Sequence, residues 1–407
     1  MVANEKNISN VPLSRQLIPK EERLAFSPKK ASLTIALLKE NDEAERRVCL
    51  SPEAVGLLVQ NGHKILVEKG AGLASQYEDI HYSEVGAFIV ETKEELLKAS
   101  VILKVSALSH EEISALGKNQ ALLTTLQLMS RDKAYFAQLA EKKITAFAFE
   151  KIKDKTGSYP IIRSMGEIVG NTSLHIAAKY LAHHKYGNGS MLGGIPGLKP
   201  TEVVIIGAGT VGENAAQSAI GMGASVKVFD NSVYRLRRLQ NNIKSKIFTS
   251  VLQPKNLEEA LTTADVVLGA MRKRKGTPSF LVPAYMVQKM KKGAVIIDVS
   301  IDEGGLFETS RLTTHNKPVY QEFGVTHYCV PNIASGVPRT ASQALSNFFM
   351  PVILQIAESG GVDQVLRSDT GFRSGIYLYN GVITDKEIGE TFHLSYRDLD
   401  LLLAILH

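Results

Sequence analysis

The chain has 407 residues, which allows two or three domains at the usual size of about 150 residues each. Hydrophobic residues make up 44% of it, enough for buried cores, and no apolar run reaches the roughly 18 residues of a membrane-spanning helix. The net charge of +6 is dispersed, so we expect neither a nucleic-acid nor a membrane partner. Two cysteines indicate no disulfide framework, and without a signal-peptide pattern a cytoplasmic location is expected.

The first half of the chain alternates between short apolar runs and stretches of helical periodicity. Residues 1–32 are polar and are expected to form an N-terminal extension. Ser51-Pro52-Glu53 marks a helix start, with a capping serine, a proline at the first helical position and an acid in the first turn. This alternation predicts an α/β unit with a parallel sheet and helices on both faces. The expected strands are 34–38, 64–68, 101–105, 121–125 and 145–149.

A second α/β unit is predicted after a glycine-rich break at residues 187–197, which is typical of a loop or hinge. Beyond residue 343 the chain becomes helical, and its apolar end at 399–406 is expected to pack on a domain or a neighbouring subunit. The short basic run 272–275 is expected to be a solvated loop, or a loop near cofactor phosphates. The expected strands are 202–206, 225–229, 264–269 and 294–299, with helices at 214–222, 234–242 and 284–291.

The strand at 202–206 leads directly into a Gly-x-Gly-x-x-Gly motif, the fingerprint of a dinucleotide-binding turn. Gly207 permits the tight turn, Gly209 lets the backbone approach a pyrophosphate, and Gly212 lets helix and strand pack closely. The following helix offers unpaired N–H groups and a positive dipole end to the phosphates. Asp230, at the end of the next strand, would accept hydrogen bonds from the adenosine ribose hydroxyls, which favours NAD over NADP. The alternative is an ordinary glycine turn.

Six separated segments share one family's order and near-family spacing: 45–52, 67–72, 296–305, 313–315, 330–334 and 337–340. Together they resemble the alanine dehydrogenase family, which is related to the NAD-binding subunit of proton-translocating transhydrogenase. The resemblance covers roughly residues 33–365. It implies a Rossmann NAD domain, 161–338, inserted into a discontinuous catalytic domain made of 1–160 and 339–407. It also implies reversible oxidation of L-alanine to pyruvate and ammonia, with hydride transfer to NAD, and a homo-oligomer, commonly a hexamer.

The resemblance also implies roles for individual residues. Arg47 matches the family's substrate arginine, and a guanidinium can bind a carboxylate bidentately. Asp302 matches an aspartate of acid–base chemistry beside the nicotinamide, just beyond the end of a parallel strand. The alternatives are a surface arginine and an aspartate that caps a loop. Further positions that line NAD in the family are Thr210, Val211, Arg235, Met271, Val299 and Asn332; no metal ligands are expected.

Two positions depart from the family pattern. Ser106 takes the place of the catalytic lysine of a Lys-x-Lys pair, and Gln127 takes the place of the active-site histidine. Both can hydrogen-bond to a carbonyl, but neither exchanges a proton near neutral pH, and losing such a group typically costs about 10²–10⁴-fold in rate. Because strand side chains alternate, we hypothesise that Lys104 reaches the substrate carbonyl from the same face as Ser106. A smaller departure is Gly166, which replaces a serine that contacts the cofactor.

The sequence therefore favours an NAD-dependent amino-acid dehydrogenase of the alanine dehydrogenase type. Arg47 would hold the substrate carboxylate, Lys104 would polarise the carbonyl or imine, and Asp302 would order water and shuttle protons. One alternative is an NAD(H)-binding paralogue with reduced catalysis and a regulatory or assembly role. Another is a dehydrogenase for a different small amino or keto acid. A transhydrogenase subunit is disfavoured, because segments 313–315 and 337–340 look closer to alanine dehydrogenase.

Overall fold

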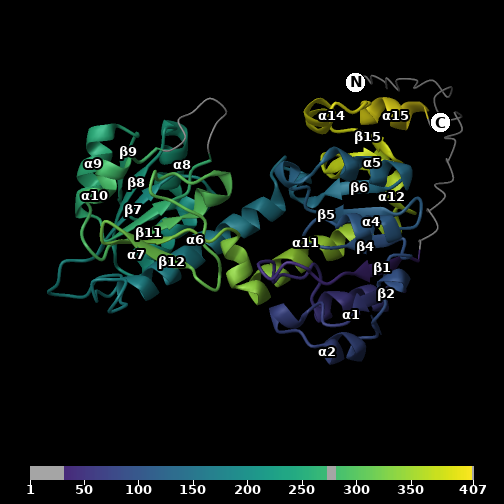
Figure 1. Ribbon diagram of the computed structural model, residues 1–407, viewed down its shortest axis with the longest axis horizontal. Coiled ribbons are helices and arrows are strands. Elements are labelled where there is room, and N and C mark those ends of the chain that lie inside the picture. Colours follow the sequence, from purple (N-terminus) through teal and green to yellow (C-terminus); the bar gives the residue numbers. More distant parts are fainter. Residues whose placement is uncertain (1–31, 273–280, 406–407) are drawn as a thin grey trace, which may run out of the picture.

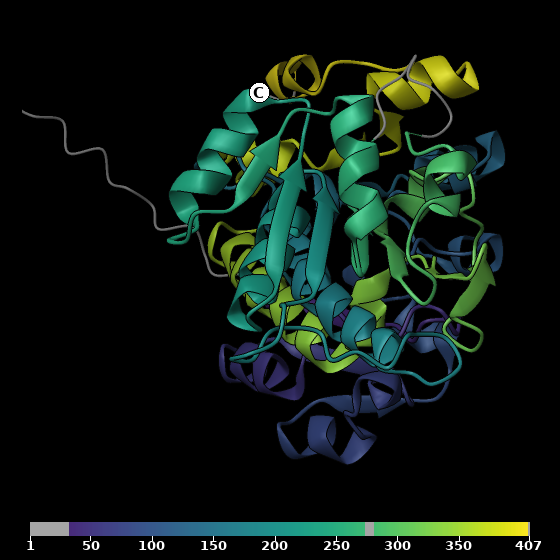
Figure 2. The same cartoon turned by 90° about the vertical axis from the view of Figure 1, so that its left-hand side faces the viewer.

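The computed structural model describes residues 32–272 and 281–405. The N-terminal extension expected at 1–32, apart from its last residue, and most of the basic run 272–275 lie outside these ranges. The described chain forms two α/β units that lie side by side (Figure 1). Viewed along the axis that joins them, the second unit lies in front of the first (Figure 2). Within the described ranges, no helix is both long and apolar enough to cross a membrane.

The first unit contains an eight-stranded sheet in the order β15-β14-β6-β5-β4-β1-β2-β3. All five strands expected between residues 34 and 149 are present and pair in parallel. The strands are β1 (Thr34–Leu37), β2 (Lys64–Glu68), β3 (Phe88–Val90), β4 (Val101–Leu103), β5 (Ala121–Thr124), β6 (Thr145–Ala148), β14 (Ile376–Tyr379) and β15 (Val382–Ile383). The helices are α1 (Pro52–Gln60), α2 (Asp79–Glu84), α3 (Lys93–Leu96), α4 (His110–Ala115), α5 (Lys133–Glu141), α12 (Val362–Ser368), α13 (Thr370–Arg373), α14 (Lys386–Phe392) and α15 (Leu399–Ile405).

The first sheet is not purely parallel. β14 runs antiparallel to β6, and β15 runs antiparallel to β14. The turn between β14 and β15 is Asn380-Gly381, both with positive φ (47° and 82°), which is the turn chemistry of a tight hairpin. The C-terminal part of the chain therefore adds strands to this sheet as well as the expected helices.

The second unit contains a seven-stranded sheet in the order β12-β13-β11-β10-β7-β8-β9. It is parallel except for its edge strand β12, which pairs antiparallel with β13. The strands are β7 (Glu202–Ile206), β8 (Ser225–Phe229), β9 (Phe248–Ser250), β10 (Val266–Gly269), β11 (Val295–Asp298), β12 (Val319–Glu322) and β13 (Val325–Tyr328). The helices are α7 (Thr210–Gly221), α8 (Val233–Asn242), α9 (Pro254–Thr263) and α10 (Ala284–Gln288).

Two long helices, α6 (Pro160–Leu181) and α11 (Pro338–Glu358), join the units and contact each other (Figure 1). The strands before α6 and after α11 build the first sheet, and those between the two helices build the second. Helix α6 packs tightly on α7, because a Cβ on Gly170 would lie only 2.5 Å from the carbonyl oxygen of Val211. The second unit is thus inserted into the first along the chain.

The central strands are buried on both faces, which explains their nearly continuous apolar runs. In β1, Ile35 and Leu37 belong to one core cluster, and Ala36 packs into another on the opposite face. Strand β7 divides its residues between two clusters in the same way. Because parallel strands end at the same edge of a sheet, the segments that follow them gather there. The candidate site residues Arg47, Lys104, Ser106, Gln127, Asp302 and Asn332 lie on such segments of the two sheets.

Candidate active site

Arg47 lies on the segment after β1, and its guanidinium is already engaged by a neighbour. Its Nε and Nη2 donate to the two carboxylate oxygens of Glu45, at 2.7 and 2.6 Å. Both side chains are largely buried, with 12% and 8% exposure. Burial lowers the pKa of Arg47, but the hydrogen bonds and charge of Glu45 outweigh it and raise the pKa above its ordinary value. Arg47 is therefore fixed in direction and charged.

The other edge of this guanidinium faces a much weaker acceptor. Nη1 of Arg47 lies 3.4 Å from the thioether sulfur of Met165, on helix α6. A thioether accepts hydrogen bonds weakly, whereas a carboxylate matches the fork of two N–H groups. This edge could bind a ligand carboxylate while Glu45 keeps the opposite edge.

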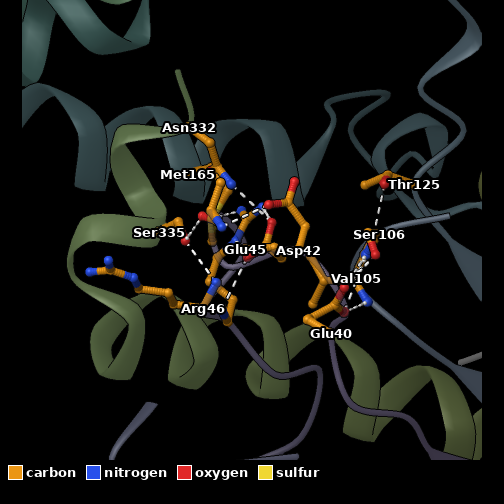
Figure 3. A network of polar contacts seen from close by, with 12 residues as sticks. Glu40, Asp42, Glu45, Arg46, Val105, Ser106, Thr125, Met165, Asn332 and Ser335 are labelled. Carbon is orange, nitrogen blue, oxygen red and sulfur yellow. Dashed lines mark hydrogen bonds and ion pairs between the residues drawn. The ribbon is translucent and has the colours of Figure 1, made fainter. Parts of the chain in front are cut away.

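Asn332 connects this pair to the second unit. It follows β13, has a left-handed backbone (φ 54°), and donates from Nδ2 to Glu45 Oε2 at 2.9 Å (Figure 3). Its backbone N–H is directed to the carboxylate of Asp302. One residue thus joins the carboxylate that orients Arg47 with the carboxylate that follows β11.

Asp302 lies in the short 3₁₀ turn Val299–Glu303 after β11 and keeps its side chain accessible to solvent. Even so, the surrounding protein raises the pKa of Asp302 by desolvation, and the charges of Glu303 and Asp298 raise it further. The Asn332 N–H opposes this shift but does not cancel it. The structure therefore brings Arg47, Asn332 and Asp302 into one network, as a shared site requires.

Three serines that no sequence motif had pointed to hold the segment after β1 in place. Ser335 accepts from the Arg46 N–H at 2.8 Å and donates to the Ala44 carbonyl at 2.7 Å (Figure 3). Ser342 and Ser346, one turn apart on α11, accept from the N–H groups of residues 48 and 51 at 2.9 and 2.7 Å. Their spacing of four residues on one helix is the only sequence signal for this role.

The Lys104 ammonium is paired with Glu112, whereas the sequence suggested that it reaches the substrate carbonyl from the face it shares with Ser106. Strand β4 ends at Leu103, so the alternation of side chains does not extend to residue 106. The Lys104 ammonium is 1% exposed and donates to both carboxylate oxygens of Glu112, on α4, at 3.0 and 2.9 Å. Burial raises the pKa of Glu112, but Lys104, the Ser109 N–H and Lys93 outweigh it and lower the pKa to about 2. Lys104 is thus held in a buried ion pair.

Ser106 and Gln127 have different surroundings. Ser106 is half-buried and donates its hydroxyl to Glu40, which also accepts from the Val105 N–H at 2.7 Å (Figure 3). Gln127 is exposed, has a left-handed backbone (φ 47°), and accepts from Nη2 of Arg131 at 3.3 Å. Glu40 was also missed from the sequence, although an acid a few residues beyond the end of a buried parallel strand is a recognisable signal.

The glycine motif has the backbone geometry of a dinucleotide cradle. Gly207 has φ 115°, and a Cβ there would lie 2.3 Å from the Ala270 carbonyl oxygen. A Cβ on Gly212 would lie 1.8 Å from the carbonyl oxygen of Gly207, so helix and turn touch there. At Gly209, by contrast, no atom of the described residues lies within 4 Å of a Cβ position. The open space beside Gly209, at the start of α7, leaves the backbone accessible to a pyrophosphate.

The residues around this cradle suit the rest of a dinucleotide. Asp230 is 2% exposed and accepts from the N–H groups of Ala208 and Ser232 at 2.8 and 2.7 Å. Each carboxylate oxygen keeps a second lone pair for a ribose hydroxyl. The guanidinium of Arg235 lies 3.9 Å from Asp230 and is half-exposed. Thr210 and Val211 begin α7. Gly166 of α6 packs closely against them, because a Cβ on Gly166 would lie 3.3 Å from the Thr210 side chain.

Met271 and Val299 lie where the neighbouring strands β10 and β11 end. The hydroxyl of Ser300 donates to the Met271 carbonyl at 3.0 Å, which ties the two segments together. The edge that carries the glycine motif therefore also carries Met271, Val299 and Asp302. These features define a two-domain α/β protein with a Rossmann-type dinucleotide site at the edge of its inserted unit.

Comparison with known proteins gives the family. Residues 36–169 match the model of the alanine dehydrogenase/PNT N-terminal domain, and residues 173–386 match that of the C-terminal domain. The chain belongs to this alanine dehydrogenase/PNT family. Alanine dehydrogenase of Staphylococcus saprophyticus is 37% identical over 369 residues, 90% of this chain and 99% of that protein. Alanine dehydrogenase of Bacillus subtilis is 37% identical over 365 residues, 89% of this chain and 96% of its own. A solved L-alanine dehydrogenase superposes with a TM-score of 0.82 at 34% identity, over 89% and 99% of the two chains.

Proposed function

We propose that the protein is an NAD-dependent dehydrogenase that interconverts L-alanine with pyruvate and ammonia. The observation that carries this proposal is the Arg47 guanidinium, oriented by Glu45 and linked through Asn332 to Asp302. A carboxylate-binding group and a titratable group thus meet beside a dinucleotide cradle. The relatives named alanine dehydrogenase, each matched over almost its full length, support the same activity.

Arg47 binds the substrate carboxylate in this proposal. Glu45 holds the Nε/Nη2 edge, so the substrate approaches the edge that carries Nη1, next to Met165. The pairing prevents the guanidinium from turning, which lowers the entropy lost when the substrate binds. A lysine could not replace this fork, because its ammonium is a single point charge.

The cofactor is NAD, which supplies the hydride acceptor and donor of the reaction when it is bound. The turn from Gly207 to Gly212 would hold its pyrophosphate, and Asp230 would bind the adenosine ribose. Thr210, Val211, Arg235, Met271, Val299 and Asn332 would complete the surroundings of the cofactor.

Asp302 orders water and moves protons at the edge where the nicotinamide would lie. Its raised pKa brings its carboxyl group closer to the pH at which it can both accept and release a proton. The Asn332 N–H orients that carboxyl. Ser106 and Gln127 are proposed as hydrogen-bonding groups for the substrate, whereas the buried pair with Glu112 argues against a direct role of Lys104.

The domain roles follow from this assignment. Residues 1–160 and 339–407 would form the catalytic domain, and residues 161–338 the NAD domain. We also propose that the chain acts as a cytoplasmic homo-oligomer, with a hexamer as the specific expectation. Size-exclusion chromatography with light scattering tests the assembly.

A second candidate function rests on Gln127 and Lys104. Because Gln127 is exposed and Lys104 is paired with Glu112, the chain could bind NAD(H) with little turnover and act as a regulatory paralogue. The test combines an NADH-binding titration with NADH oxidation in the presence of pyruvate and ammonium. Turnover that disappears in Arg47→Ala supports the dehydrogenase. Tight binding of NADH without turnover, on pyruvate or on a panel of small keto acids, favours the paralogue.

A further inference from the structure

Glu40 is a titratable side chain at the site that the proposed function has not used. It lies three residues beyond the end of β1, and its carboxylate is directed at the segment that follows β4. Oε1 accepts from the Val105 N–H at 2.7 Å, and both oxygens lie 3.3 Å from the Ser106 backbone nitrogen. The Ser106 hydroxyl donates to Oε2 (Figure 3). Three contacts with backbone nitrogens and one with the Ser106 hydroxyl therefore hold this carboxylate in place.

The Ser106 side of this contact is fixed as well. Thr125, beyond the end of β5, donates to the Val105 carbonyl from its hydroxyl at 2.8 Å and from its backbone N–H at 3.1 Å. Figure 3 shows Thr125, Val105, Ser106 and Glu40 as one connected group beside Glu45. A hydroxyl held against a carboxylate in this way can take a proton on one side and release one on the other.

We propose that Ser106 and Glu40 form the proton relay of the substrate site, with Ser106 contacting the substrate and Glu40 storing the proton. This inference rests on the proposed dehydrogenase function. It gives a chemical purpose to the contact between the Ser106 hydroxyl and the Glu40 carboxylate. Glu40 acts through Ser106 and is a positioning residue in this scheme.

The net result of the relay is the transfer of one proton from the substrate to Glu40. In the direction of alanine oxidation, the substrate ammonium must lose one proton before hydride can leave its α-carbon. Ser106 Oγ accepts that proton while its own hydroxyl proton passes to Glu40 Oε2. One N–H bond and one O–H bond break, and an O–H bond forms on each oxygen. Ammonium becomes a neutral amine, Glu40 becomes a carboxylic acid, and Ser106 is unchanged.

The electrostatic surroundings allow Glu40 to change protonation. Burial raises the pKa of Glu40, and the negative charge of Glu45 raises it further. The Ser106 hydrogen bond and the positive charge of Lys104 lower the pKa, but the net shift is upward. Arg47 and Cys49 also interact with the Glu40 charge. Because the Ser106 hydrogen bond stabilises the ionised form, removing that hydroxyl raises the pKa of Glu40 further.

The test is the pH dependence of alanine oxidation in the full-length protein with NAD, for wild type, Glu40→Gln and Ser106→Ala. Glu43→Gln is the matched control, an exposed acid on the same segment. Glu40→Gln should lower kcat by about 10²–10⁴-fold, with KM for alanine within a few-fold, and should remove the acid limb of the kcat profile. Ser106→Ala should lower kcat to a similar extent, because it removes the hydroxyl through which Glu40 acts, and any acid limb that remains should lie at higher pH. Unchanged limbs in both variants, with Glu43→Gln like wild type, overturn the relay.

A second measurement does not depend on turnover. The carboxyl carbon of Glu40 can be followed by NMR in protein labelled with ¹³C-glutamate and assigned by its loss in Glu40→Gln. The relay predicts a titration that moves to higher pH in Ser106→Ala; an identical titration in both proteins overturns it. If the wild-type protein shows no turnover, the proposed dehydrogenase function is refuted. The NMR result then still decides whether the Ser106 hydroxyl affects the protonation of Glu40.

Discussion

Asn332 Nδ2 lies 2.9 Å from Glu45 Oε2, so a residue of the inserted unit touches the carboxylate that orients Arg47 in the first unit. The same residue directs its backbone N–H to Asp302. The position of the substrate arginine is therefore linked to the position of the inserted unit. Any change at Asn332 should alter both units at once.

Replacing Asn332 by aspartate tests this link. The change exchanges a donor for an acceptor and places two carboxylates at hydrogen-bonding distance. The repulsion should lower kcat/KM for alanine by at least about tenfold, equivalent to about 1.4 kcal/mol. Steady-state kinetics measure this, with Asn332→Ala as the control that removes the bond without adding charge. Equal kinetics for the aspartate and alanine variants would show that the repulsion is unimportant.

Arg47→Lys should keep the charge but lose the planar fork. An ammonium has no rigid, planar set of N–H groups that can serve Glu45 on one edge and the substrate carboxylate on the other, so kcat/KM for alanine should fall by roughly 10²-fold, while NADH affinity stays unchanged. The matched control is Arg46→Lys, because the Arg46 side chain points away from the network (Figure 3). A similar loss in both variants would mean that the substrate carboxylate does not bind to Arg47 alone.

The two glycines of the cradle should respond differently to alanine. A Cβ on Gly209 meets no described atom within 4 Å, so Gly209→Ala should leave the unfolding midpoint unchanged and weaken NADH binding at least about tenfold. A Cβ on Gly212 would lie 1.8 Å from a carbonyl oxygen, so Gly212→Ala should destabilise the fold by about 1–3 kcal/mol or more. Urea denaturation and NADH fluorescence titration separate the two effects. Normal NADH affinity in Gly209→Ala would place the pyrophosphate elsewhere.

The buried pair Lys104–Glu112 should make stability depend on pH. The pKa of Glu112 is lowered from 4.5 to about 2, so its contribution is complete above pH 4.5 and is lost as pH falls toward 2. The lost contribution is roughly 3 kcal/mol. Glu112→Gln should flatten the acid side of the stability curve measured by urea denaturation. An acid limb as steep as that of wild type would show that other carboxylates dominate.

Much of the fold could be predicted from the sequence because the central strands are buried on both faces. Their apolar runs, such as β1 and β7, are local features that need no partner to be recognised. The hairpin of β14 and β15 also had a local signal in Asn380-Gly381, but its strands are short, and β14 lies more than 200 residues from β6, its partner in the sheet. Long helix α6 was not predicted, because its glycines interrupt the apolar pattern.

The site was harder to predict, because its contacts join residues far apart in the chain. Side-chain alternation does not extend beyond Lys104, because β4 ends at Leu103, and the Lys104 ammonium pairs with Glu112 on another element. The contacts of Glu45 with Asn332 and of Glu40 with Ser106 span 287 and 66 residues. No local pattern encodes such pairs. The first pair joins the two units, and the second forms because β1 and β4 are neighbours in the first sheet.

The most direct test of the proposed dehydrogenase function is reduction of NAD by the purified protein with L-alanine as the only substrate, in wild type and in Arg47→Lys. We expect alanine-dependent formation of NADH by wild type and a kcat/KM that falls roughly 10²-fold in the variant, while NADH binds both equally. Tight NADH binding by wild type with no NADH formed from alanine, and none consumed with pyruvate and ammonium, would contradict it.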